Sequence, residues 1–144
     1  MENRHGLVVN TRLTPATGTA EREAALALLR ERPGRQRVTV GGDKNYDTQG
    51  FVAQARALGI TPHVSQNIQR SGGSAIDGRT TRHAGYAISQ RKRKLVEECF
   101  GWTKTVGGGR KLRYIGVKKN QLWATFTATA FNLVRMANIE AQAI

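Results

Sequence analysis

The stretch RKRKLVEECFGWTK, residues 91–104, places two carboxylates inside the densest run of positive charge in the sequence. In a helix that turns about 100° per residue, Arg93, Glu97 and Lys104 lie on one stripe. Leu95 and Cys99 mark a second stripe, which is apolar and able to pack on a core. A carboxylate flanked by cations suits metal and phosphate chemistry. A solvated helix face with i,i+4 ion pairs gives the same pattern, so this stretch alone leaves both interpretations open.

The composition indicates one domain that binds a polyanion. The 144 residues include 23 Lys and Arg against 10 Asp and Glu, a formal net charge of +13. Residues 91–119 hold ten of these cations and two of the acids, so most of the excess surrounds the opening stretch. Nucleic acid is therefore the expected partner. Charge alone does not separate an enzyme from a structural nucleic-acid-binding protein.

Cysteine usage and hydropathy narrow the class of protein further. Cys99 is the one cysteine, which excludes a disulfide framework or a thiolate zinc cluster within the chain. A single cysteine also predicts a reducing cytoplasm as the setting. No apolar run approaches the roughly 18 residues that a membrane-spanning helix requires. We therefore expect no membrane span.

A glycine-rich turn supplies the second group of candidate residues. The strand expected at Arg37–Val40 is followed by GGDKNYD, residues 41–47. Loops at the carboxyl ends of strands carry the chemistry of open α/β sheets, which makes Asp43 a candidate acid with the cation Lys44 beside it. The two glycines allow close approach of a ligand. Asp47 instead suits the N-cap of the helix expected after it, and we interpret it as structural.

The rest of the sequence alternates short strands with helices. We expect strands at residues 5–11 and 61–65, helices at residues 19–33 and 48–58, a polar loop at 66–83, a glycine-rich connector at 106–114, and a long amphipathic helix from about residue 119 onward. The arginines of the polar loop are either phosphate contacts or solvated side chains.

The two groups of candidate residues together resemble the DDE transposases of bacterial insertion sequences. Those enzymes have a Gly-Asp-Lys-x-Tyr-Asp segment at the second catalytic aspartate, which residues 42–47 match with Asp43 in that role. Many of them also carry the signature Y-(2)-R-(3)-E-(6)-K. Its last three positions are filled, at the correct spacing, by Arg93, Glu97 and Lys104.

The sequence departs from the family pattern at two places. Gln90 stands where the signature has tyrosine, and Tyr86 lies four residues earlier. The family also places its first catalytic aspartate on an earlier strand, whereas the acids before Asp43 are Glu2 and three glutamates of the first expected helix. We therefore expect residues 1–144 to be the C-terminal portion of a transposase DDE catalytic domain, through truncation of the gene or division of the protein.

The resemblance implies a fold and a chemistry. The fold is a partial RNase H-like α/β domain, with helices flanking a short mixed sheet that lacks its first strands. The activity is DNA cleavage and strand transfer with divalent metal, in which Asp43 and Glu97 are the catalytic metal ligands. Mg²⁺ is the expected ion because it prefers hard carboxylate oxygens. The residues expected to hold DNA phosphates are Lys44, Arg91, Arg93, Lys94 and Lys104.

The resemblance also implies partners and a setting. The partners are DNA, both as transposon ends and as target, and either a second copy of the chain or an N-terminal transposase fragment. The setting is the bacterial cytoplasm, in association with the nucleoid. We expect the isolated chain to be inactive, because a two-metal site needs a third acid.

Two other functions fit the same residues. One is a non-catalytic, DNA-binding remnant of a transposase that uses the same basic surface. The other is a basic RNA-binding protein, in which Asp43 and Glu97 have no special effect.

Overall fold

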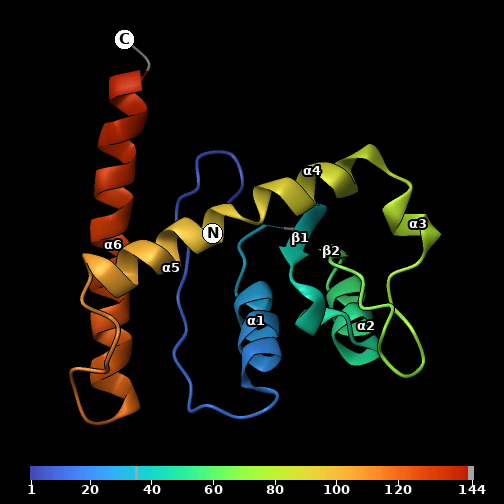
Figure 1. Ribbon diagram of the computed structural model, residues 1–144, viewed down its shortest axis with the longest axis horizontal. Coiled ribbons are helices and arrows are strands. Elements are labelled where there is room, and N and C mark those ends of the chain that lie inside the picture. Colours follow the sequence, from blue (N-terminus) through green and yellow to red (C-terminus); the bar gives the residue numbers. More distant parts are fainter. Residues whose placement is uncertain (35, 143–144) are drawn as a thin grey trace. The chain divides into compact units, whose positions relative to one another are not determined.

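A computed structural model describes residues 1–34 and 36–142, which form two compact units (Figure 1). One unit is Gly18–Arg93, and the other joins residues 1–17 to the chain from Lys94 onward. Each unit has buried residues of its own.

The unit Gly18–Arg93 is built on a pair of parallel strands. Its elements in chain order are α1 (Ala20–Arg30), β1 (Val38–Gly42), the 3-10 helix η1 (Lys44–Tyr46), α2 (Gln49–Ala57), β2 (Ile60–Val64), α3 (Gly78–Thr81) and α4 (Ala84–Lys92). Val38 lies opposite Ile60, and Gly42 lies opposite Val64. The helical crossover α2 makes this pairing possible, because a tight turn cannot join parallel strands.

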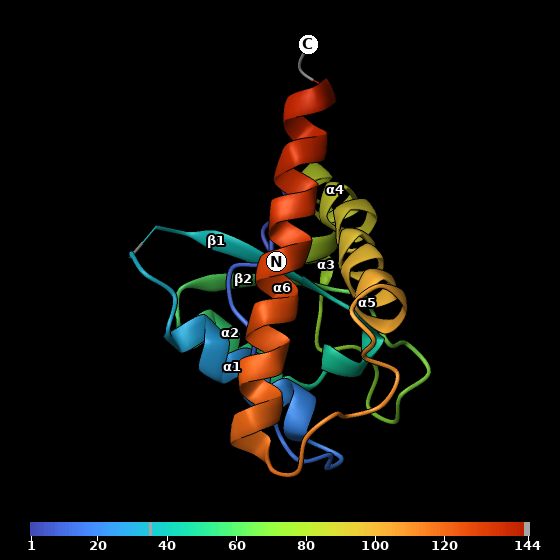
Figure 2. The ribbon, with the colours of Figure 1, turned by 90° about the vertical axis from the view of Figure 1, so that its left-hand side faces the viewer.

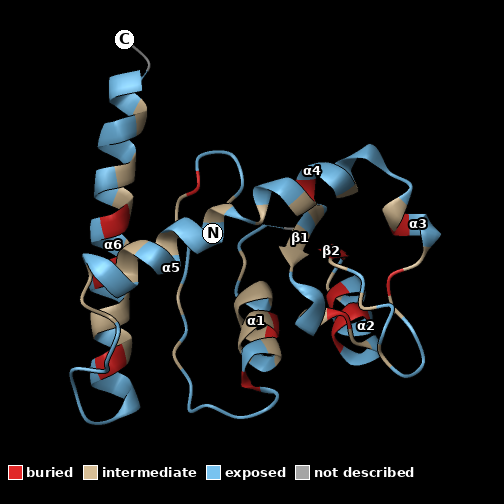
Figure 3. Ribbon diagram, in the orientation of Figure 1, coloured by how far each residue is buried: buried red, intermediate tan, exposed pale blue. Residues whose placement is uncertain are grey.

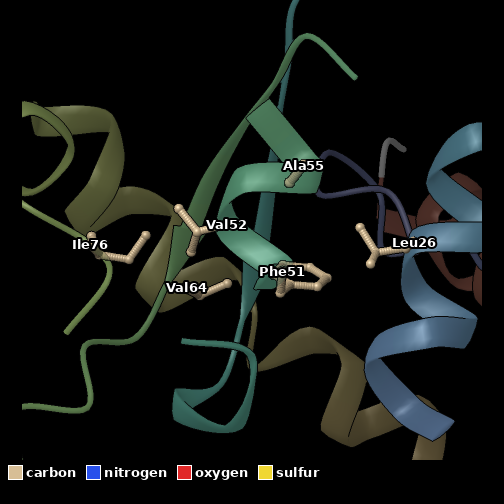
Figure 4. Close-up of a cluster of buried hydrophobic side chains, with 6 residues drawn as sticks. All are labelled: Leu26, Phe51, Val52, Ala55, Val64 and Ile76. Atoms are coloured by element: carbon tan, nitrogen blue, oxygen red, sulfur yellow. The ribbon is translucent and has the colours of Figure 1, made fainter. Parts of the chain in front are cut away.

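The core of this unit lies between α1, α2 and β2. Its buried side chains are Leu26, Phe51, Val52, Ala55, Val64 and Ile76 (Figure 4). Helix α2 supplies three of them because positions 51, 52 and 55 fall on one helical face. Figure 3 shows α2 as the helix of this unit with the most buried residues along it.

The bounds of α2 confirm one sequence prediction and correct another. The helix covers residues 49–57 of the expected 48–58, and Gly59 follows with φ +72°, a conformation that glycine adopts readily. The N-cap is Thr48, whose Oγ1 accepts the Phe51 N–H at 3.2 Å. Asp47, the expected cap, has a different function that is described below.

The second unit pairs two helices, α5 (Leu95–Thr105) and α6 (Val117–Gln142). They lie against each other (Figures 1 and 2), and the rings of Trp102 and Phe131 meet edge to face with centroids 5.8 Å apart. The long helix expected from about residue 119 is thus confirmed as α6. It packs on α5, which is one of the two packing partners expected for it.

The strand expected at residues 5–11 is not formed. Side chains of α6 provide hydrogen bonds to this segment in place of a neighbouring strand. Asn132 accepts the Val8 N–H and donates to the Val8 carbonyl, both at 2.8 Å, and Arg135 Nε donates to the His5 carbonyl at 2.9 Å. The predicted mixed sheet is therefore wrong for the described residues, whose sheet is the parallel pair alone.

The helix expected through residues 91–104 is interrupted. Helix α4 ends at Lys92 and α5 begins at Leu95, with Arg93 and Lys94 as the caps between them. The Arg93 N–H bonds back to Ser89, whereas the Glu97 N–H bonds to Lys94 in a tighter i→i+3 turn. Arg93 therefore belongs to the end of α4, and the expected stripe with Glu97 and Lys104 does not run along one helix.

Candidate functional site

The end of β1 presents Asp43 to solvent. The residue has extended backbone angles and caps η1, because its Oδ1 accepts the Asn45 N–H at 2.8 Å. This bond fixes the direction of a carboxylate that remains exposed, and the adjacent Lys44 is exposed as well. The expectation that Asp43 follows directly on a strand is confirmed.

The glycines before Asp43 are needed for packing. A Cβ on Gly42 would lie 3.0 Å from Val64 Cγ1, and a Cβ on Gly41 would lie 3.4 Å from Arg93 Cβ. In this structure the space that the sequence suggested for a ligand is occupied by neighbouring side chains. The close contact at Gly41 brings Arg93 against β1, two residues before Asp43.

Gln90 holds Arg93 in this position. Its Nε2 donates to the His63 carbonyl of β2 at 2.6 Å, and its Oε1 accepts Arg93 Nε–H at 3.1 Å. Arg93 is half-buried, so these bonds restrict a side chain that would otherwise be mobile. Gln90 thus links β2 to Arg93.

Two further contacts fasten α4 to β2. The Tyr86 hydroxyl donates to the Val64 carbonyl at 3.0 Å, and His63 Nδ1 lies 2.7 Å from Ser89 Oγ. His63 and Ser89 are both buried. Burial lowers the pKa of His63, which favours a neutral imidazole in this pair. Tyr86 therefore has a packing role against the sheet.

Asp47 closes a loop that follows β2. Its carboxylate is buried, with 1% of the residue exposed. Oδ2 accepts the Asn67 N–H at 2.6 Å, and Oδ1 accepts the Ala75 N–H at 2.9 Å. The Arg70 guanidinium turns inward and donates to the Asp47 carbonyl. One carboxylate thus joins the two ends of the loop Asn67–Ala75.

The sequence offers a second candidate N-cap beside Asp47, which the assignment of Asp47 as the cap overlooked. Asp47 and Thr48 are consecutive residues of types that cap helices, and one helix needs only one N-cap. With Thr48 as the cap, Asp47 was therefore available for other bonds. Arg70 was expected either to contact phosphate or to remain solvated, and the structure gives it an intramolecular partner instead.

The two carboxylates of the opening stretch differ in their contacts. Both lie in the first turn of α5, where negative charge is favourable to the helix dipole. Glu98 Oε2 lies 3.8 Å from Arg135 Nη1 of α6, so Glu98 takes part in packing the two helices. Glu97 and Glu98 are both exposed.

Lys104 borders a basic hollow at the end of α5. The hollow has a volume of about 480 Å³ and is lined by Lys104, Thr105, Gly108, Arg110 and Lys111. Three of the five lining residues are cations, and none is acidic. Such a concave, positively charged surface suits a phosphate group. Lys104 was predicted to hold phosphate, whereas Arg110 and Lys111 lie in a segment that was predicted to be a connector first and a phosphate contact second.

The three consecutive glycines shape this hollow. A Cβ on Gly107 would lie 2.8 Å from the Thr103 carbonyl oxygen, and one on Gly109 would lie 2.8 Å from the Trp123 ring. Gly108 has φ +68°. No other residue type fits this close turn between α5 and the connector, so the glycines keep the cations of residues 110–111 beside Lys104.

The candidate residues thus form two groups, one in each unit. Asp43, Lys44 and Arg93 belong to the unit Gly18–Arg93, whereas Glu97 and Lys104 belong to the other unit. Arg91 and Lys94 are exposed on either side of the junction. Across residues 1–34 and 36–142, no three His, Cys, Asp or Glu side chains gather closely enough to hold a metal ion.

Comparison with known proteins identifies the family. The family described as Transposase DDE domain matches residues 48–137, more than half of the chain. The protein belongs to the transposase DDE domain family. No curated protein and no solved structure gives a match.

The family match covers one of the two groups of candidate residues in full. It includes Arg93, Glu97 and Lys104 and begins after Asp43. The assignment of Asp43 therefore depends on its own segment and on its position at the end of β1.

In the part of the chain that the structure describes, no helix is long and apolar enough to cross a membrane.

We expect Asp47→Ala to destabilise the unit Gly18–Arg93 by about 2–4 kcal/mol, because it leaves two partly buried N–H groups without acceptors. Hydrogen exchange should show lost protection at the Asn67 and Ala75 amides. Thr48→Ala is the matched control: it removes the α2 cap at a cost of about 1 kcal/mol and leaves both amides protected. Unchanged protection in Asp47→Ala would contradict the loop-closing role.

Proposed function

We propose that this DDE domain supplies Asp43 and Glu97 as metal ligands to an insertion-sequence transposase that cleaves and joins DNA. The observation that carries the proposal is the end of β1. There an exposed carboxylate is fixed by Asn45, and Arg93, a residue of the transposase signature, is held against the same strand. An acid and a cation at one strand end suit a phosphodiester substrate.

The donor atoms fit a hard divalent cation. Asp43 offers an exposed, oriented carboxylate and Glu97 an exposed one, and carboxylate oxygens are the ligands that Mg²⁺ prefers. Bound Mg²⁺ would supply Lewis acidity for activating water or a DNA 3′-hydroxyl and for stabilising the leaving oxygen.

The basic side chains position the DNA backbone. Arg93 is restrained by Gln90 and therefore loses little freedom when it binds a phosphate. The hollow beside Lys104 concentrates three cations for a second phosphate contact. Lys44, Arg91 and Lys94 are exposed and available as further phosphate contacts. Contacts of this kind set the register of DNA without reading its sequence.

A further carboxylate would come from a partner chain. Two-metal sites for phosphoryl transfer use acids that bridge and fix the ions, and two carboxylates are fewer than such a site requires. We propose that an N-terminal transposase segment, supplied by a separate chain in the bacterial cytoplasm, brings this acid. A remnant that binds DNA without chemistry is the competing function, and the nicking assay below separates the two.

DNA affinity is expected to fall steeply with salt, because binding through phosphates releases counterions. Replacing Lys104 and Lys111 by alanine should weaken binding to a random duplex. A plot of the logarithm of the association constant against the logarithm of the salt concentration should also become less steep, by about 0.9 for each lost phosphate contact. Fluorescence anisotropy over a salt series measures both quantities.

The matched control for this experiment removes two positive charges elsewhere. Arg4 and Arg56 are exposed and lie outside the basic hollow, so the Arg4→Ala, Arg56→Ala variant should keep the slope of the unmodified chain. A flat salt dependence, or equal effects of the two double variants, would remove the hollow from the DNA-binding surface.

Metal-dependent nicking of a supercoiled plasmid tests the catalytic role. The chain alone should show no nicking, and an N-terminal DDE transposase fragment with the first catalytic aspartate should restore it in trans. Glu97→Gln should abolish the restored activity. Glu98→Gln, which loses only the ion pair with Arg135, should retain it.

The possible outcomes of the nicking assay separate the candidate functions. Nicking by the lone chain that Glu97→Gln abolishes would contradict the need for a third acid. No nicking under any condition, with DNA binding intact, would favour the non-catalytic remnant. Equal loss of activity in Glu97→Gln and Glu98→Gln would contradict the assignment of Glu97 as a ligand.

A further inference from the structure

The loop closed by Asp47 has one large apolar side chain that packs on nothing. Ile68 is 77% exposed, whereas Ile76, one residue beyond the loop, is 2% exposed and part of the core. Two long side chains at this loop bond back to the chain. Arg70 donates to the Asp47 carbonyl, and Gln66 Nε2 donates to the Ile76 carbonyl at 2.7 Å. Ile68 is thus presented outward.

The loop is preformed. Two successive turns shape it, because the Arg70 N–H bonds to the Asn67 carbonyl at 3.2 Å and the Gly73 N–H bonds to the Arg70 carbonyl at 2.8 Å. Gly72 and Gly73 have φ values of +85° and +73°, which glycine adopts without strain. With both ends of the loop held by Asp47, the position of Ile68 is set before any partner binds.

The loop begins at the same end of the sheet as Asp43. The Ser65 N–H donates to the Gly42 carbonyl at 2.9 Å, which continues the strand pairing by one residue and places the loop entrance beside the residue before Asp43. A DNA segment held at Asp43 therefore passes close to this loop.

We propose that the loop Asn67–Ala75 is a preformed wedge that inserts Ile68 between base steps of duplex DNA, with Asp47 as its positioning residue. The inference depends on the DNA-binding function proposed above. Apolar side chains on rigid elements partly unstack a base step and kink the duplex by roughly 20–90°. An exposed isoleucine on a basic chain suits this role, because binding to phosphates alone does not require an apolar side chain.

The test measures bending separately from binding. A duplex of about 20 base pairs, labelled at its two ends with a donor and an acceptor dye, reports its end-to-end distance by energy transfer. Anisotropy of the same duplex gives the affinity. The unmodified chain should bind and raise the energy transfer. Ile68→Ala should bind within about threefold of that affinity, since phosphates dominate it, and should leave the energy transfer near that of free DNA.

Three further variants complete the design. Ile68→Leu keeps an apolar side chain of equal size and should preserve the kink. Val9→Ala removes apolar atoms from a site that is 71% exposed in the other unit, and should also preserve it. Asp47→Asn should lose the kink because the amide keeps one acceptor oxygen for the two ends of the loop. Urea unfolding should show that Ile68→Ala is as stable as the unmodified chain.

Any of three results would overturn the wedge. Binding without any change in energy transfer, or equal energy transfer with the unmodified chain and Ile68→Ala, would show that Ile68 does not insert. Absence of binding by the unmodified chain would contradict the proposed DNA-binding function itself, and the wedge with it.

Discussion

The parallel pairing of β1 with β2 is the constraint on which the site depends. It places the carboxyl ends of both strands at the same end of the sheet. Asp43 directly follows β1, and Ser65, at the loop entrance, directly follows the neighbouring strand β2. The glycines at the end of β1 let the neighbouring side chains of Val64 and Arg93 come close. Without this pairing, neither the Asp47 bonds nor the position of Arg93 could form.

Polar side chains hold the elements around this pair together. Tyr86, Ser89 and Gln90 attach α4 to β2, and Asp47 attaches the loop after β2 to the turn before α2. Hydrogen bonds from buried polar groups add modest net stability, yet they are costly to leave unmade. They therefore select one arrangement of surface elements over others that bury similar apolar area. This specificity is what a site for a rigid polyanion requires.

The sequence predicted local features well and interrupted or long-range features poorly. The position of Asp43 and the extents of α2 and α6 followed from turn chemistry and periodicity. The break at Arg93 did not, because periodicity does not indicate where a helical pattern divides into two helices with different packing partners. The strand expected at residues 5–11 failed because strand formation needs a neighbour, and Asn132 supplied its hydrogen bonds instead. The role of Asp47 depends on backbone groups 20 and 28 residues away, which local patterns cannot indicate.

The central proposal is that Asp43 and Glu97 are both ligands of divalent metal. Replacing Mg²⁺ by Fe²⁺ in the presence of DNA and a reductant generates radicals that cut the polypeptide backbone near the bound ion. The proposal predicts cuts around Asp43 that Asp43→Asn removes and cuts around Glu97 that Glu97→Gln removes, with both sets suppressed by excess Mg²⁺. Cuts at one residue alone, or cuts that persist in these variants, would contradict it.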